Sequence, residues 1–218
     1  MYFHFLIEDQ SSAILIELLM EKITSKRPDL TYRCTAFRGL GGFTQKNTVK
    51  ETKTGKLLND LATYLRGFNK SLSSFPSVVV VVLDNDKNNT EEFQATLESV
   101  AQANNITVDH VFCIAVEEVE AWLLGDRAAL ITAYPFAKLQ VLNSYEQDSI
   151  CGTWEVLADA VYSGGLVKLK RDCPTYREVG ACKCEWARKI GVYMEPEKNQ
   201  SPSFQRFLFE IRKRISAA

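Results

Sequence analysis

Histidine is scarce in this chain, and the glycine-rich motifs that cradle phosphate are missing. Only His4 and His110 are present, and neither lies near a pattern typical of a catalytic nucleophile. The stretch "GLGGF" at 39–43 follows an expected strand, but the next expected helix begins too far downstream for a dinucleotide site. No Gly-x-x-x-x-Gly-Lys-Ser/Thr loop occurs. We therefore expect no ATP hydrolysis by this chain alone.

Long apolar runs and a leader-like start are also missing. The longest apolar run, Val78 to Leu83, has the length of a strand and falls far short of the ~20 residues that a membrane helix needs. The opening "MYFHFLIEDQ" has no basic region and reaches acidic residues at once, so we expect no signal peptide. These features predict a cytoplasmic protein that does not associate with a membrane.

Cysteine is present but does not form a disulfide pattern. Without a secretory signal, the scattered cysteines are expected to be free thiols in a reducing compartment. A zinc site would draw on Cys151, Cys173, Cys182 and Cys184, but Cys182 and Cys184 are separated by one residue, closer than the usual spacing of structural zinc ligands. We therefore favour free thiols over zinc.

Charge is unevenly distributed along the chain. Residues 1–165 carry 14 Lys/Arg against 21 Asp/Glu, a net of −7, and residues 166–218 carry 12 against 6, a net of +6. An acidic body favours a bound cation, and a basic end favours an anionic partner. We expect an α/β core over 1–134 and a mainly helical, basic segment over 135–218 that packs on this core.

Hydrophobic spacing alternates between strand-like and helix-like along the first part of the chain. Strands are expected at 2–7, 30–39, 76–84 and 110–116. Helices are expected between and after them, at 8–23, 56–68, 90–104 and 117–134, with Ser11 or Ser12 capping the first. This order predicts an α/β fold: a mostly parallel sheet with helices on both faces. Further helices are expected at 152–162, 176–194 and 201–215, and the tryptophans are expected to be packing residues.

Carboxylates follow three of the expected strands. Glu8 ends the first strand, Asp84 and Asp86 end the valine-rich strand, and Glu117 with Glu120 follow the last one. Because parallel strands present their carboxyl ends at one edge of a sheet, we expect these acids to gather there. So many negative groups need a cation, and oxygen ligands favour Mg²⁺ or Mn²⁺. The plainer alternative is that each acid only caps or faces a helix N-terminus, and in that case Glu8 and Asp9 would cap the first helix.

The spacing of these acids suggests how they share one site. Asp84 and Asp86 point the same way if the segment is extended, and Glu117 and Glu120 share a face if both are helical. A cation to balance the reacting phosphate is expected from Lys87, beside the aspartates, or from the basic segment, which offers Lys183, Arg188 and Lys189.

The order of these acids separates three known folds. Haloacid-dehalogenase phosphatases place Asp-x-Asp after the first strand, which here ends in Glu8. Response-regulator receiver domains resemble "FLIEDQSSAILIELLMEKI", with Asp84 as the phospho-acceptor, but in them that residue comes much earlier in a shorter chain. A glutamate after the first strand and Asp-x-Asp after the third is similar to the Toprim domain. "AVEEVEAWLLGD" and "WARKIGVYMEPEKNQSPSFQRFLFEI" resemble the bacterial, Toprim-like domain-of-unknown-function family DUF4276, and this resemblance covers most of residues 1–214.

The resemblance implies a Toprim-like fold and metal-dependent phosphodiester hydrolysis on DNA or RNA. Glu8, Asp84, Asp86 and Glu120 would hold Mg²⁺ or Mn²⁺, Glu8 would also serve as general acid or base, and Glu117 and Lys87 would assist catalysis. The basic C-terminal segment would follow the sugar-phosphate backbone. By the same resemblance, the protein is a nuclease of a bacterial anti-phage defence system with an ABC-type ATPase as partner. The alternative is a non-catalytic module of the same fold that binds a nucleic acid or a nucleotide.

Overall fold

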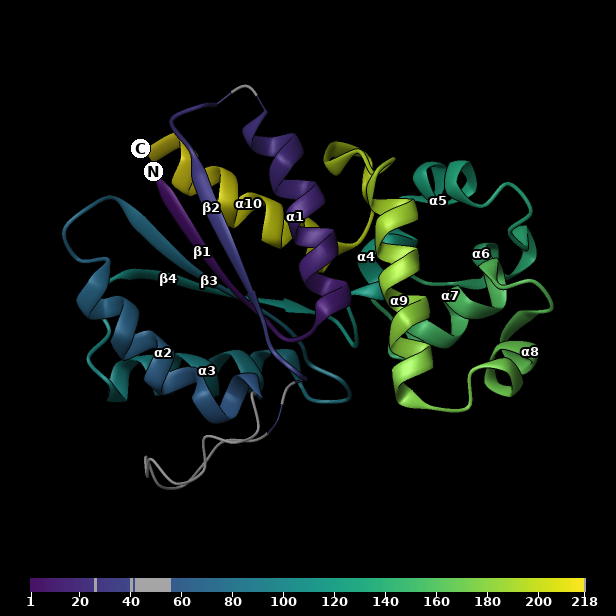
Figure 1. Cartoon of the computed structure of the whole chain (residues 1–218), viewed down its shortest axis with the longest axis horizontal. Coiled ribbons are helices and arrows are strands. Elements are labelled where there is room, and N and C mark those ends of the chain that lie inside the picture. Colours follow the sequence, from purple (N-terminus) through teal and green to yellow (C-terminus); the bar gives the residue numbers. More distant parts are fainter. Residues whose placement is uncertain (26, 40, 42–55, 218) are drawn as a thin grey trace.

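A four-stranded parallel sheet forms the centre of the molecule. The computed structural model describes residues 1–25, 27–39, 41 and 56–217 (Figure 1). Its strands are β1 (Tyr2–Ile7), β2 (Thr31–Ala36), β3 (Ser77–Asp84) and β4 (Asp109–Ala115), in the order β2-β1-β3-β4. Every neighbouring pair runs parallel, which confirms the predicted sheet and its flanking helices. The arrangement is consistent with a Rossmann-like or Toprim-like fold.

Strand β3 is buried along its whole length because both faces of the sheet are covered. Residues Val78, Val80 and Val82 belong to the hydrophobic core on one face, whereas Val79 and Val81 belong to the core on the other. A strand that alternates between two apolar cores needs no polar residues on either side, which explains the unbroken valine run. This run ends at Asp84, the last residue of the strand.

Helices from different parts of the chain cover the two faces. The face containing Val80 packs against α1 (Gln10–Thr24) and α10 (Pro202–Ala217). The opposite face packs against α2 (Leu57–Ser71) and α3 (Thr90–Ala103), which lie together below the sheet in Figure 1. The aromatic residues of α10 are core residues, as expected: Phe204 and Phe207 lie 5.5 and 5.1 Å from the ring of Trp122.

The other described helices form a second group beyond the carboxyl ends of β3 and β4 (Figure 1). They are α4 (Glu120–Gly125), α5 (Arg127–Ala133), α6 (Leu139–Ser144), α7 (Thr153–Val161), α8 (Gly165–Asp172) and α9 (Tyr176–Gly191), followed by the 3₁₀ turn η2 (Pro196–Lys198). Helices α6 and α8 were not predicted. Where one helix was expected over 117–134 there are two, because Asp126 leaves the helical conformation and its carboxylate accepts hydrogen bonds from the amides of Ala129 and Glu195.

Helix α9 packs against α1, and this contact positions Lys183, the part of the site that α9 carries. The ammonium of Lys22 donates to the carbonyls of Gly191, Val192 and Met194, each at 2.7 Å. It thus binds the end of α9 and the turn that follows it. Gly191 allows close approach, since a Cβ there would lie 2.9 Å from Leu18. The division of the chain at residue 134 stays a prediction.

Two smaller sequence predictions also need comment. Helix α1 is capped by Asp9, which accepts from the amide of Ser12 at 2.8 Å, so the prediction of Ser11 or Ser12 as cap is wrong. A loop is expected over residues 39–55, which are rich in glycine, threonine and lysine. This stretch lies outside the described residues, apart from Gly39 and Gly41. Within the described residues, no helix is both long enough and apolar enough to cross a membrane.

Candidate functional site

The carboxyl ends of β1 and β3 define the place where a ligand site is expected. These strands are neighbours, yet the chain leaves β1 toward β2 and leaves β3 toward β4 on the other side. Such a switch point opens a crevice beyond the strand ends, because the following connections diverge. Glu8 follows β1 and Asp84 ends β3, so both acids occupy this position.

Glu8 and Asp84 are held together by the backbone. One carboxylate oxygen of Glu8 accepts a hydrogen bond from the amide of Asp84 at 3.0 Å. The carboxylate of Asp84 accepts from the amide of Val119 at 3.0 Å, which ties the end of β3 to the segment after β4. The side chain of Asp84 is buried, with 7% of its surface exposed. The sequence prediction that these two acids meet is therefore confirmed.

Two further acids come from the segment after β4, and one lysine comes from α9. The ammonium of Lys183 lies 3.2 Å from Glu120 and 3.5 Å from Glu118. The second oxygen of Glu118 accepts from the amide of Trp154 at 3.2 Å. We call Glu8, Asp84, Glu118 and Glu120 the carboxylate cluster. Among the described residues, no other lysine or arginine forms an ion pair with these four acids.

The carboxylate cluster carries more acid than the single lysine can balance. Burial raises the pKa of Glu8 to about 7, and repulsion from Asp9 and Asp86 adds to this effect. Burial and the nearby Glu8 raise the pKa of Asp84 well above its usual range, and burial with the nearby Glu120 raises the pKa of Glu118 to about 7. Burial alone would lower the pKa of Lys183, but the attraction of Glu120, Glu118 and Asp84 outweighs it and raises this pKa. The lysine is therefore charged, and the acids compete for too few positive charges.

Asp86 and Lys87 lie at the exposed rim of the cluster. Asp86 has a positive φ of 50°, so the segment after Asp84 is not extended and the argument that Asp84 and Asp86 point the same way is wrong. Asp86 still contributes to the repulsion that raises the pKa of Glu8. Lys87 is exposed and forms no ion pair with any residue that the structure describes.

Glu117 has a different role from Glu120. Helix α4 begins at Glu120, and Glu117 precedes it with a φ of 61°, so the prediction that both share one helical face is wrong. Its carboxylate accepts from the amides of Cys151, Gly152 and Thr153 at 2.9–3.1 Å and from the hydroxyl of Thr153. Burial would raise its pKa, but the hydrogen bonds from Thr153, Gly152 and Cys151 together lower it. Glu117 therefore serves as an anion bound at the start of α7.

Sequence reasoning missed two residues of the site. Asn85, between the two aspartates, is fully buried, and its side-chain oxygen accepts from the amide of Glu117 at 2.6 Å. This bond joins the two strand exits, where Asp86 also donates to the carbonyl of Glu117 at 3.0 Å. Glu118, next to Glu117, is not among the site residues that the sequence predicts. Nothing in the "EEVE" pattern distinguishes Glu118 from its neighbours. Only the contact with Lys183 in the folded structure identifies it as part of the site.

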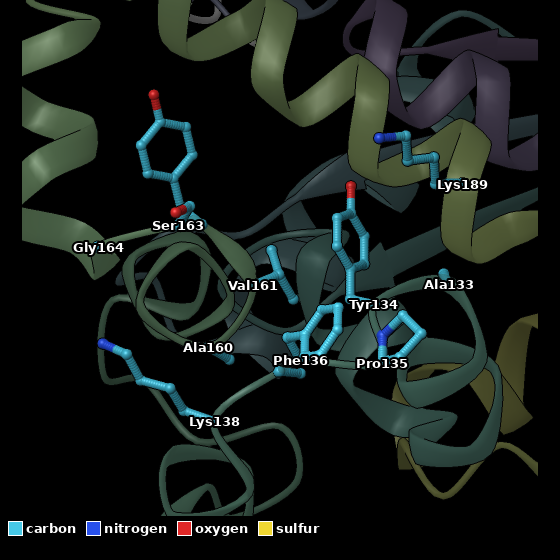
Figure 2. Close-up of a pocket in the computed structure, with 12 residues that line it drawn as sticks. Ala133, Tyr134, Pro135, Phe136, Lys138, Ala160, Val161, Ser163, Gly164 and Lys189 are labelled. Atoms are coloured by element: carbon cyan, nitrogen blue, oxygen red, sulfur yellow. The ribbon is translucent and has the colours of Figure 1, made fainter.

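A cleft of about 450 Å³ opens beside the carboxylate cluster. Its walls come from the loop after β3, the segment after β4 and the start of α7, and they include Asp86, Lys87, Glu118, Ile150 and Trp154. We call this the Trp154 cleft. A pocket of about 490 Å³ lies elsewhere, between the α5–α6 loop and the end of α7 (Figure 2). Its two lysines are already paired, Lys138 with Asp159 and Lys189 with Glu185, and no member of the carboxylate cluster lines it.

The donor set of the cluster suits a hard divalent cation. All donors are carboxylate oxygens, the ligands that Mg²⁺ and Mn²⁺ prefer, and they are partly or wholly buried with an excess of negative charge. As placed, however, no three His, Cys, Asp or Glu side chains of the described chain converge into a preformed metal cage. This result includes the cysteines considered for zinc, of which Cys173 and Cys182 have their sulfurs 3.7 Å apart.

The basic C-terminal helix does not reach this site. Arg214 forms ion pairs with Asp109 and Glu210, and Arg212 with Glu197. Asp109 begins β4, so Arg214 lies at the edge of the sheet opposite to Asp84. Among the residues that the structure describes, the basic side chain that pairs with the cluster is Lys183, one of the three candidates from the basic segment.

Comparison with known proteins places the chain in a family. Residues 7–212 match the model of the family described as Domain of unknown function (DUF4276), and the chain belongs to this family. No curated protein and no solved structure matches the chain.

Proposed function

We propose that the protein is a metal-dependent phosphodiesterase that cleaves nucleic acid. The observation that carries this proposal is the carboxylate cluster: four partly or wholly buried acids from three strand exits, with one ammonium, Lys183, among them. Without a further cation, such a cluster costs stability, because burial and mutual repulsion disfavour the charged forms and raise the pKa values of Glu8 and Glu118 to about 7. Perturbed acids beside a cleft favour a functional site over a structural one.

The residues of the cluster and those beside it would take three roles: metal binding, proton transfer and charge balance. Glu8 and Asp84 would hold Mg²⁺ or Mn²⁺ together with Glu120, and Asp86 would complete the site from the rim. The ion, when bound, would polarise the scissile phosphate and steady the leaving oxygen. Glu8, with a pKa of about 7, is also suited to hold or release a proton during the reaction. Lys183 supplies a fixed positive charge toward the phosphate, which makes it a better candidate than the exposed Lys87.

Strained backbone at two strand exits supports a functional role for this edge. Asp86 and Glu117 both adopt positive φ values, which are uncommon for residues other than glycine. Both conformations are held by hydrogen bonds between the two exits. Such strain is often found at active sites, where it fixes groups that would otherwise relax.

The test is cleavage of supercoiled plasmid, linear duplex, single-stranded DNA and total tRNA, each with Mg²⁺, Mn²⁺ or EDTA. The wild type is compared with Glu8→Gln, Asp84→Asn and Asp86→Ala, and with Glu17→Gln, an exposed acid on α1 away from the cluster. The proposal predicts metal-dependent cutting by the wild type and the Glu17 variant that is lost with Glu8→Gln and Asp84→Asn. Absence of cutting in every condition, with no thermal shift on adding Mn²⁺, would overturn it.

A non-catalytic module is the second candidate, and one observation favours it. Lys183 already lies between Glu118 and Glu120, and the described side chains form no metal cage as placed. In that case the lysine replaces the ion, and the site binds nucleic acid or a nucleotide without chemistry. Asp86→Ala then leaves ligand binding intact and keeps or raises stability, whereas it lowers the activity of a metal enzyme.

The biological setting follows from the resemblance described above. We propose a cytoplasmic nuclease of a bacterial anti-phage defence system that works with an ABC-type ATPase. Co-purification of the chain with the product of a neighbouring ATPase gene, compared with the chain alone, tests this part separately from the chemistry.

A further inference from the structure

We propose that the Trp154 cleft binds a single unpaired nucleobase, so that the protein acts on single-stranded rather than duplex nucleic acid. The inference rests on the proposed function, because the cleft is taken to hold the nucleotide next to the one whose phosphate is cut. The cleft shares Asp86 and Glu118 with the rim of the carboxylate cluster. A group bound in it therefore lies directly beside the candidate metal-binding acids.

Charge decides which part of a nucleotide enters the cleft. Asp86, Glu117, Glu118 and Glu155 line it, against the single lysine Lys87. Their negative charge would repel a phosphate group, whereas a neutral base is free to enter and can donate hydrogen bonds from its amino groups to Asp86 or Glu155. The carboxylate of Glu117 is already bound by the amides at the start of α7. The cleft is thus suited to the base, and the phosphate is left outside it, where Lys183 and the cation of the proposed function would balance its charge.

Trp154 offers the surface on which such a base would stack. It is half-buried, in contrast to Trp122 and Trp186, which are 0% and 3% exposed. The neighbouring Ile150 is 51% exposed and extends the apolar wall of the cleft. Base stacking on an aromatic side chain contributes binding energy for any base, because every base has a flat π-face.

Two lysines near the indole complete the arrangement. Lys170 lies 5.5 Å and Lys183 5.9 Å from the centre of the Trp154 ring. Lys183 is held in place by Glu118 and Glu120, whereas Lys170 is largely exposed and pairs weakly with Glu155 at 3.8 Å. Lys170 can therefore move from the ring to an adjacent phosphate when a base takes its place. A base in a duplex must first be unstacked and unpaired, at a free-energy cost, so the cleft favours unpaired nucleotides.

The experiment is a binding titration in EDTA, which keeps it independent of cleavage. Short oligodeoxycytidylate and oligocytidylate strands, and DNA duplexes of the same length, are added to the full chain while tryptophan fluorescence is followed. The same titrations, read by anisotropy of a labelled strand, are made with Trp154→Ala, Trp154→Phe and Lys170→Gln. The matched control is Phe136→Ala, which removes a 99% exposed aromatic from the other pocket (Figure 2).

We expect single strands to quench the fluorescence and to bind on the order of tenfold or more weakly to Trp154→Ala. Trp154→Phe keeps most of the affinity, since phenylalanine still stacks, and Phe136→Ala binds as the wild type does. Equal binding of single strands by the wild type and Trp154→Ala, with thermal stability unchanged, would overturn the inference. So would duplex binding with the same dependence on Trp154.

Failure of this inference can be told apart from failure of the proposed function. Binding that depends on Trp154, without cleavage in Mg²⁺ or Mn²⁺, supports the base subsite and contradicts the nuclease. Metal-dependent cleavage that is equally fast with Trp154→Ala, on single strands and duplexes alike, supports the nuclease and contradicts the subsite.

Discussion

At the scale of residues, the most informative feature is the imbalance between four acids and one lysine. The carboxylate of Glu8 is bound by the amide of Asp84, and the carboxylate of Asp84 is bound by the amide of Val119. Because both are held by the backbone, these carboxylates cannot move apart to relieve their repulsion. Protons or a cation must supply the missing charge. Removing one acid therefore has opposite effects on stability and on metal binding.

The first prediction concerns Asp84→Asn and Glu8→Gln. Each variant replaces a buried acid, whose charged form is disfavoured, with a neutral side chain of the same shape. The metal-free protein should therefore melt higher, by about 2–4 °C for each kcal/mol of relieved repulsion. Cleavage should fall by at least about 100-fold. Differential scanning fluorimetry with and without Mn²⁺ measures the first effect, and Glu17→Gln serves as control. A lower melting temperature in EDTA would show that these acids stabilise the fold.

The second prediction concerns Lys183→Met. Loss of the buried ammonium leaves Glu118 and Glu120 without their partner, and removing one member of a buried pair costs about 3–5 kcal/mol. The loss should be smaller at acidic pH, because the pKa of Glu118 is already about 7 and protonation removes the need for a counter-charge. Urea unfolding at about pH 8 and about pH 5.5 measures the difference. Lys183→Arg, which keeps the charge, should lie between the wild type and Lys183→Met.

The sequence could predict the acids more readily than their partners. Glu8 and Asp84 follow buried strands, and the geometry of parallel sheets brings strand ends together, so their meeting needed no further information. The conformation of Asp86 depends on the bond from its amide to Glu117, and the choice of Lys183 over Arg188 and Lys189 depends on how α9 packs on α1. Such tertiary contacts leave no local pattern in the sequence.

At the scale of elements, Glu117 joins the sheet to the helical group. Its carboxylate is bound by three amides and a hydroxyl at the start of α7, so it fixes the helix that carries Trp154. The same acid lies at a strained position after β4. The side chain of Glu117 therefore links the end of β4 to the start of α7.

The third prediction concerns Glu117→Gln. An amide accepts weaker hydrogen bonds from backbone N–H groups than a carboxylate, so the free energy of unfolding should fall by about 1–2 kcal/mol. The folded-state pKa of Glu117 is lowered, so its contribution is present above the unfolded value of 4.5 and is lost as pH falls through the folded value. The difference from the wild type should thus shrink in acid. If Glu117 instead binds the metal, Glu117→Gln abolishes the Mn²⁺ thermal shift.

The order of the strands and helices could be predicted from the sequence, but the residues at which they begin and end were harder to predict. The strands and the helices between them follow from spacing alone, as the valine run of β3 shows. The break at Asp126 was not predictable, because its carboxylate accepts from Glu195, an amide 69 residues away. Helix α8 begins at glycines with positive φ, residues that by themselves argue against a helix.

At the scale of the whole molecule, the cluster links stability to pH and to metal. The pKa values of Glu8 and Glu118 are raised from 4.5 to about 7, so the unfolded chain loses these protons first as pH rises. The contribution of these two acids to the free energy of unfolding of the metal-free protein should therefore decrease as the pH rises from about 4.5 to about 7.

The fourth prediction follows from this linkage. A bound cation replaces the protons, so Mn²⁺ should raise the melting temperature more at about pH 8 than at about pH 5.5. The measurement is a melting series across this range with Mn²⁺ or EDTA, and Asp84→Asn is the control that should lose the difference. A Mn²⁺ effect independent of pH would place the ion away from the raised acids.

The late position of Lys183 in the chain has a consequence for biosynthesis. Every acid of the cluster has been made by residue 120, but the ammonium arrives 63 residues later. A nascent chain that has completed its sheet therefore holds an acid cluster with no lysine partner, and the apolar side of α1 that receives α9 is still open. The site is complete only when nearly the whole chain has left the ribosome. The four acids therefore gain their lysine partner only after α9 has been synthesised and has packed against α1.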